Sequence, residues 1–121
     1  MSDLTPLTPA VFHTLLALAS GERHGYAIMQ EVAASTEGRV RLGPGTLYGS
    51  IKRMLRDQLI QESDERTDPE LGDERRRYYR LTSVGRRTLN AEAARLEGLV
   101  ALARQKGLLR GVRATPDGRP A

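Results

Sequence analysis

The sequence predicts a mainly α-helical fold with one small β-hairpin, and three observations lead to this prediction. Three apolar patterns with the period of an α-helix occupy the first 57 residues. Two short β-like segments then flank a charged loop, and a long helical pattern follows them. The chain has 121 residues and no cysteine, so it suits one small domain with an appendage and forms no disulfide.

The first helix is predicted to begin at Thr8 and Pro9, because a hydroxyl N-cap followed by proline is a common helix start. Apolar residues follow with helical spacing until Gly21, which is expected to end the helix. Val11 and Leu18 add a second apolar stripe to the same helix. We therefore expect this helix to be covered twice, once by its own domain and once by a partner chain.

The next two helices are predicted over residues 25–36 and 44–57, and Gly43 and Pro44 open the second of them. The link between the two helices, from Gly38 to Gly43, has the short length that a helix-turn-helix requires.

The helix over residues 44–57 has an apolar face and a basic face when its residues are placed about 100° apart. No acidic residue lies between Glu37 and Asp57. Glycine inside a helix costs about 1 kcal/mol against alanine, so glycines on the basic face indicate close approach by another molecule. The apolar face holds Leu47, Ile51, Met54 and Leu55, and the basic face holds Gly45, Gly49, Lys52, Arg53 and Arg56.

A basic helical face with little bulk fits the major groove of duplex DNA. Lys52 and Arg53 lie at its middle, where either can reach a guanine edge or a phosphate. Thr46 either contacts DNA or caps the helix start, and Tyr48 either binds a phosphate or covers the core. The alternative for the whole face is a solvated amphipathic helix. The candidate contacts on this helix are Thr46, Tyr48, Gly49, Ser50, Lys52 and Arg53.

Residues 60–63 and 77–82 are predicted to form two strands, and the polar segment between them is the mobile tip of a wing. Residues 64–77 contain six acidic and four basic side chains, so DNA would repel this loop if all of its side chains faced the duplex. We expect Arg75, Arg76 and Arg77 to approach phosphates while the acidic side chains point outward or pair with neighbouring arginines. At least one of the three arginines is expected to be structural.

A helical pattern over residues 83–106 would be roughly 36 Å long, which is longer than the preceding domain can cover. Its apolar seam therefore predicts a dimerisation helix, and the alternative is a helix folded back on its own domain. The predicted order is a winged helix-turn-helix domain over residues 1–82, a dimerisation helix over 83–110 and a disordered tail over 111–121. The predicted dimer contacts are Val11, Leu18, Leu89, Ala93, Leu96, Val100 and Ala103.

The composition limits the classes of function that this chain can have. The net charge of +4 and the isoelectric point of about 10.0 fit a nucleic-acid partner. No apolar run is long enough to span a bilayer and no signal pattern begins the chain, so we expect a cytoplasmic protein. His13 and His24 lack metal-ligand spacing, and His24 is expected to make a hydrogen bond in a turn. We find no catalytic constellation and expect neither an enzyme nor a cofactor.

Five segments stand out by their order and spacing, and they are Leu15–Leu18, His24–Ile28, Gly45–Tyr48, Gln58–Ile60 and Arg75–Thr82. Together they resemble the PadR family of bacterial transcriptional regulators, in particular its smaller subfamily with a single C-terminal helix. The resemblance implies a homodimer that binds a palindromic operator, usually as a repressor, and that a small molecule often releases. Some relatives bind planar drugs with tryptophan, which this chain lacks.

These observations leave two hypotheses from different classes. The first is a sequence-specific DNA-binding repressor that acts as a homodimer. The alternative is a winged-helix module whose basic face docks an acidic protein. Protein interfaces usually contain aromatic anchors, and this face offers only Tyr48, which favours DNA.

Overall fold

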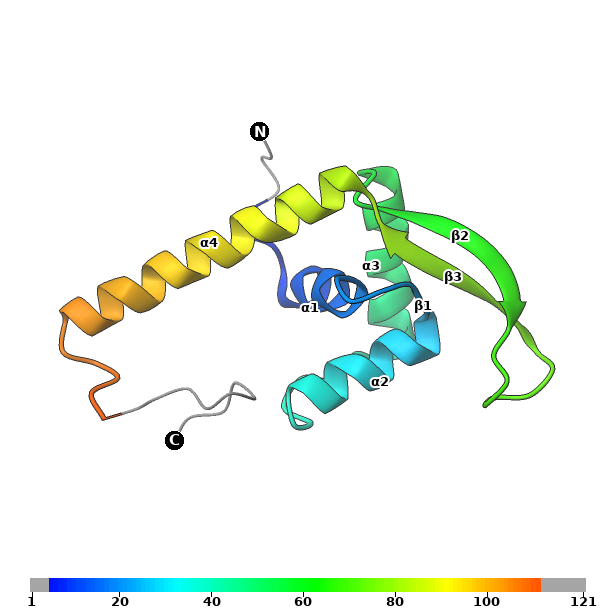
Figure 1. The fold of residues 1–121 in the computed structure, drawn as a ribbon, viewed down its shortest axis with the longest axis horizontal. Helices are drawn as coiled ribbons and strands as arrows, with labels where there is room; N and C mark the ends of the chain where they lie inside the picture. Colours follow the sequence, from blue (N-terminus) through cyan, green and yellow to red (C-terminus); the bar gives the residue numbers. More distant parts are fainter. Residues whose placement is uncertain (1–4, 112–121) are drawn as a thin grey trace.

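The computed structural model describes residues 5–111, which form four helices and a three-stranded sheet. Figure 1 shows α1 at the centre, α2 and α3 beside it, and the hairpin of β2 and β3 at one end. The predicted tail lies outside the described residues from residue 112 onward. The elements are α1 (Pro9–Leu18), β1 (Arg23–His24), α2 (Gly25–Ser35), α3 (Pro44–Arg56), β2 (Ile60–Thr67), β3 (Arg75–Leu81) and α4 (Ser83–Gln105).

The helix starts follow local capping chemistry. The hydroxyls of Thr8 and Thr82 each accept a hydrogen bond from the backbone N–H three residues ahead, and so cap α1 and α4. Gly43 precedes α3, and no side chain caps that helix. Thr46 is exposed inside α3, so the capping alternative for Thr46 is wrong.

The sheet has the antiparallel order β1-β3-β2, with the short strand β1 added to the predicted hairpin. Arg23 and His24 pair with Tyr79 and Tyr78 of β3. Strands β2 and β3 are longer than the sequence predicts, because their pairing continues into the charged segment. A bulge between Glu62 and Glu65 interrupts their register.

The core surrounds α1, which contacts α2, α3, α4 and β3. Val11 and Leu18 are buried in this core, so their predicted role in a dimer contact is wrong. The second apolar stripe of α1 is instead covered by other elements of the same chain. Leu89 of α4 is also buried in the core, which corrects its predicted place in an exposed seam.

Helix α4 begins in the core and then leaves it. Its first half packs on α1, and the far half projects beyond the other helices (Figure 1). The backbone at Gly85 lies so close to Leu59 that a Cβ would collide with the Leu59 carbonyl. Glu92 is buried and accepts hydrogen bonds from the Leu7 backbone N–H at 3.1 Å and from Arg95 at 2.7 and 2.9 Å. The start of the chain and α4 are thereby held together.

Two features are missing from residues 5–111. No helix there is both long and apolar enough to cross a lipid bilayer. The same residues contain no group of three or more histidine, aspartate or glutamate side chains placed to hold a metal ion.

Candidate nucleic-acid interface

Helix α3 buries its apolar face and exposes its basic face. Leu47, Ile51 and Met54 lie in the core, whereas Leu55 is partly exposed. On the opposite side, Lys52 and Arg53 are exposed, and within residues 5–111 neither forms an ion pair with a carboxylate. These two cations are therefore available to a polyanion.

Arg56 differs from the other two cations of α3. Its guanidinium donates hydrogen bonds to both carboxylate oxygens of Asp57, at 3.1 and 3.3 Å. Hydrogen bonding to Asp57 and the attraction of its charge raise the pKa of Arg56. Because Asp57 already offsets this charge, Arg56 attracts a phosphate less than Lys52 or Arg53 does.

Ser50 does not lie on the basic face. It is fully buried, and its Oγ accepts a hydrogen bond from the Arg53 guanidinium at 3.3 Å. The prediction that Ser50 contacts DNA directly is wrong, because a buried hydroxyl cannot reach an external ligand. Ser50 follows Leu47 by three residues and precedes Met54 by four, which is the spacing of the buried face. Its hydroxyl helps to orient Arg53.

The glycines of α3 are not required by contacts within the protomer. A Cβ at Gly45 would meet nothing within 4 Å, and one at Gly49 would meet only the end of the Arg53 side chain at 4.0 Å. Gly25 at the start of α2 is different, because a Cβ there would collide with the Tyr48 ring. A larger residue at position 25 would thus require Tyr48 to move, whereas nothing within the protomer requires glycine at positions 45 and 49.

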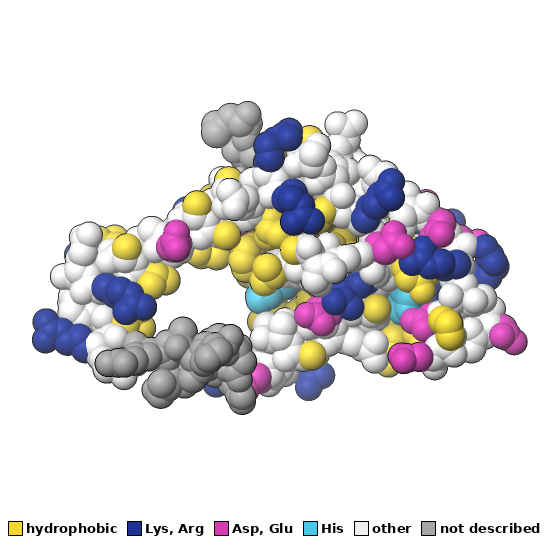
Figure 2. Space-filling view, viewed as in Figure 1, with side chains coloured by type: hydrophobic (Ala, Val, Ile, Leu, Met, Phe, Trp, Pro, Cys, Tyr) yellow, Lys and Arg dark blue, Asp and Glu magenta, His cyan; other side chains and the backbone are white. Residues whose placement is uncertain are grey.

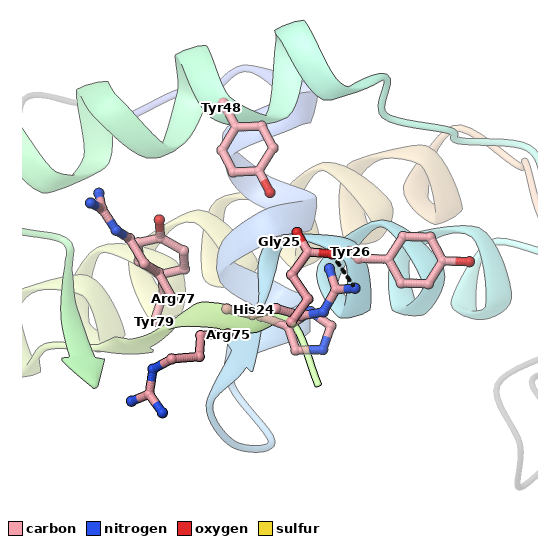
Figure 3. Close-up of a pocket in the computed structure, with 9 residues that line it drawn as sticks. His24, Gly25, Tyr26, Tyr48, Arg75, Arg77 and Tyr79 are labelled. Carbon is pink, nitrogen blue, oxygen red and sulfur yellow. Dashed lines mark hydrogen bonds and ion pairs between the residues drawn. The ribbon is translucent and has the colours of Figure 1, made fainter. Parts of the chain in front are cut away.

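A cleft lies between α3, the start of α2 and strand β3 (Figure 3). Tyr48 points from α3 toward Gly25, and half of its surface remains exposed. Its ring therefore lies against the start of α2, and the exposed part of the side chain stays accessible to a ligand. Arg75 and Arg77 line the same cleft, so α3 and the wing share one surface.

The arginines of the wing are paired with carboxylates. Figure 2 shows basic and acidic side chains interspersed over the wing at the right of the view. The prediction that the acidic side chains pair with neighbouring arginines is confirmed for Arg75, Arg76 and Arg77. Arg76 is the least exposed of them, with 25% of its side chain accessible. The pairs are Arg75–Glu65 at 3.6 Å, Arg76–Glu74 at 3.5 Å, and Arg77 with Glu62 at 3.4 Å and Glu65 at 3.8 Å.

The wing is fixed to the start of α2 through His24. The His24 Nδ1 accepts a hydrogen bond from the Ala27 N–H at 3.1 Å, which confirms the predicted turn hydrogen bond. Its Nε2 lies 2.8 Å from a carboxylate oxygen of Asp68, and this hydrogen bond lowers the pKa of Asp68. On the same side of the wing, the Arg66 guanidinium lies 3.6 Å from the centre of the Tyr78 ring. Sequence reasoning missed Asp68, because nothing local links it to a histidine 44 residues away.

The remaining predicted dimer contacts, which are not part of the core, lie on α4 from its middle to its far end. Ala93 and Val100 are exposed, and Leu96 and Ala103 are partly exposed. The prediction omitted two large side chains of this helix, although helical spacing places them beside the seam. These are Leu99 and Leu102, which are 50% and 45% exposed.

Comparison with known proteins places these features in a family. Residues 14–91 match the model of the transcriptional regulator PadR-like family. The transcriptional regulator Rv3488 of Mycobacterium tuberculosis is 36% identical over 87 residues, which cover 72% of this chain and 75% of that protein. An uncharacterized 37.1 kDa protein in transposon TN4556 of Streptomyces fradiae is 42% identical over 89 residues. That match covers 71% of this chain but spans only 23% of the transposon protein's length.

Solved structures share the fold. A PadR family transcription regulator from Clostridium difficile R20291 aligns with a TM-score of 0.64 and 25% identity, covering 81% of this chain and 97% of that one. Bacillus subtilis PadR in complex with operator DNA aligns with a TM-score of 0.58 and 18% identity, covering 67% of this chain and 44% of that one. The helix-turn-helix, the wing and the family match agree, and the chain belongs to the PadR-like family of transcriptional regulators rather than to a family of enzymes.

Proposed function

We propose that this regulator is a homodimeric repressor that binds a palindromic operator in the cytoplasm, with α3 in the major groove. The observation that carries the proposal is the outward basic face of α3, where Lys52 and Arg53 are exposed and Gly45 and Gly49 have no internal packing role. A relative solved with operator DNA has the same fold, which supports this use of the domain.

The phosphate backbone is proposed to follow the cleft between α3 and the wing. Tyr48 of α3 and Arg75, Arg76 and Arg77 of β3 line this cleft. Arg53 is oriented by Ser50, so its guanidinium is prepared for a bidentate contact with a guanine or a phosphate. Lys52 supplies a second positive charge, and no carboxylate within residues 5–111 forms an ion pair with it. Together these groups account for both positioning and base contact.

The test compares Lys52→Ala with Lys106→Ala, because these are the only two lysines of the chain and Lys106 caps the far end of α4. Fluorescence anisotropy is measured with a duplex taken from the region upstream of the gene and with a random duplex of equal length. Lys52→Ala should weaken operator binding by about 5- to 150-fold if Lys52 reads a base. Lys106→Ala should leave binding unchanged.

Two results would overturn the DNA-binding proposal. One is unchanged operator affinity after the combined change of Lys52 and Arg53 to alanine. The other is the absence of any duplex binding by the unmodified protein at low salt, where electrostatic binding is strongest. The second result would favour the alternative, an acidic protein docked on the same face.

Dimerisation is proposed to use the projecting half of α4. Leu99, Val100 and Leu102 are each about half exposed on the part of α4 that leaves the domain, and a second copy would cover them. A twofold axis would then place two α3 helices in successive major grooves, about 34–36 Å apart. This is the reason to expect a palindromic operator.

The dimer is tested with Val100→Asp, and sedimentation velocity measures the mass in solution. In an isologous interface the change occurs twice, so its effect is doubled, and burying an unpaired carboxylate is costly. The unmodified chain should sediment as a dimer and the variant as a folded monomer with native circular dichroism. A variant that remains dimeric would refute this interface. Release of the operator by a small molecule stays a prediction from the family resemblance.

A further inference from the structure

The bulge in β2 places two glutamates on one face of the wing. Without it, regular pairing would set Asp64 opposite Arg77, but the observed register sets Glu65 there and Glu62 opposite Tyr79. Residues that pair directly across antiparallel strands lie on the same face of the sheet. Glu62 and Glu65 therefore share a face with Arg77.

That face is the one that borders the cleft beside α3. Tyr79 and Arg77 line the cleft together with Tyr48. Arg75 stands two residues before Arg77 on β3, so it lies on the same face. The arginines that would meet DNA phosphates and the two glutamates thus occupy a single surface.

The two glutamates hold the positions that a phosphate would take. A carboxylate oxygen of Glu65 lies 3.6 Å from Arg75 and another lies 3.8 Å from Arg77, so this one carboxylate bridges both arginines. A carboxylate oxygen of Glu62 lies 3.4 Å from the same Nε of Arg77. Carboxylates and phosphates bind guanidinium groups with similar geometry, so they compete for the same donors.

We propose that Glu62 and Glu65 compete with DNA phosphates for Arg75 and Arg77 and thereby lower the affinity of the wing for DNA. This inference rests on the proposed DNA-binding function and adds the residues that limit its strength. All four side chains are largely exposed, with 46–67% of each accessible. Exposed ion pairs are weak, so a phosphate can displace the carboxylates, at the cost of repulsion between the phosphate and the released charge.

The competition affects every DNA sequence to a similar degree, because phosphate contacts carry no base information. A wing with fully available arginines would strengthen binding to random DNA as well as to the operator. With the two glutamates in place, binding depends more on α3, whose Lys52 and Arg53 have no such competitors among residues 5–111.

The experiment measures duplex binding by Glu65→Gln and by the double variant Glu62→Gln with Glu65→Gln. The matched control is Glu70→Gln, which removes the same charge from the wing. Glu70 is exposed, and its side chain makes no ion pair with an arginine in the described part of the chain. Dissociation constants for an upstream duplex and a random duplex are measured by anisotropy between about 50 and 200 mM salt.

Glu65→Gln should bind both duplexes roughly 3- to 10-fold more tightly than the unmodified protein, and the double variant more tightly still. Its salt dependence should steepen by up to about 0.9 log units per log unit of salt for each further phosphate that the released arginines neutralise. Glu70→Gln should change affinity less than twofold or so, because salt screens charges beyond about 8–10 Å.

Three outcomes decide the inference. Equal affinities for Glu65→Gln and Glu70→Gln would overturn it, because only general wing charge would then matter. Weaker binding by Glu65→Gln would also overturn it, since Glu65 would then be holding the arginines in their binding positions. If the unmodified protein and all variants fail to bind either duplex, the proposed function fails together with this inference.

Discussion

Gly49→Ala should make the protein more stable and at the same time weaken its binding to DNA. Gly49 is inside α3, and a Cβ at this position would meet only the Arg53 guanidinium at 4.0 Å, which is ordinary contact with a flexible side chain. Alanine therefore fits within the protomer without strain. Replacing glycine by alanine inside a helix stabilises it by about 0.8–1 kcal/mol, which corresponds to a rise in melting temperature of about 4 °C for a domain of this size.

The opposite effect on binding follows from the place of Gly49 on the basic face. If the α3 backbone lies close to the floor of the major groove, an added methyl group must displace the helix or distort the contacts. Overpacking of a close interface costs about 1–3 kcal/mol. This cost raises the dissociation constant for DNA roughly 5- to 150-fold. Differential scanning fluorimetry measures the first effect, and anisotropy with the upstream duplex measures the second.

The matched control is Gly98→Ala in α4. A Cβ at Gly98 would also meet nothing within 4 Å, so alanine should raise the melting temperature by a similar amount and leave DNA binding unchanged. Undiminished operator affinity in Gly49→Ala would refute the argument that this glycine permits close approach to DNA. A lower melting temperature would refute the argument that its space within the protomer is free.

Two further predictions concern the joint between the domain and α4. Gly85→Ala should lower the melting temperature strongly, because the added Cβ would collide with the Leu59 carbonyl. Thermal unfolding followed by circular dichroism measures the loss. A melting temperature within a degree or so of that of the unmodified protein would contradict the close approach of the two backbones. Hydrogen bonds from Arg95 and from a backbone N–H lower the pKa of Glu92 below its ordinary 4.5, so its contribution to stability is present above that value and is lost as the pH falls through the lowered pKa. Urea unfolding between about pH 6 and pH 3 should therefore show a steeper loss of stability in the unmodified protein than in Glu92→Gln, and parallel curves would contradict the role of the carboxylate.

The helices could be predicted from the sequence because their determinants are local. Thr8 with Pro9 and Gly43 with Pro44 mark helix starts within a residue or two, and apolar spacing shows which side is buried. The ends of the strands were less predictable. Strand β2 continues through Thr67 over charged residues, where its backbone pairs with β3 without the apolar alternation that marks a strand in the sequence.

The errors in the predicted site have a common physical cause, which is that spacing along one helix does not reveal what packs on it. Val11 and Leu18 have the pattern of an exposed second stripe, yet the rest of the same chain covers them. Ser50 is polar, yet it lies within the buried arc between Leu47 and Met54. In both cases the covering surface comes from other parts of the chain, so only the tertiary structure shows it.

The distribution of charge gives α3 and the wing different roles in the proposed DNA binding. Both carry positive side chains, but the carboxylates that pair with Arg75 and Arg77 lie on the wing itself. Lys52 and Arg53 have no such carboxylate partner within residues 5–111, and they lie on the helix proposed to enter the major groove. A phosphate must displace a carboxylate to bind Arg75 or Arg77, whereas Lys52 and Arg53 form no ion pair with a carboxylate in the part of the chain that the structure describes. Sequence discrimination should therefore reside in α3, and the wing should adjust the overall strength of binding through its glutamates.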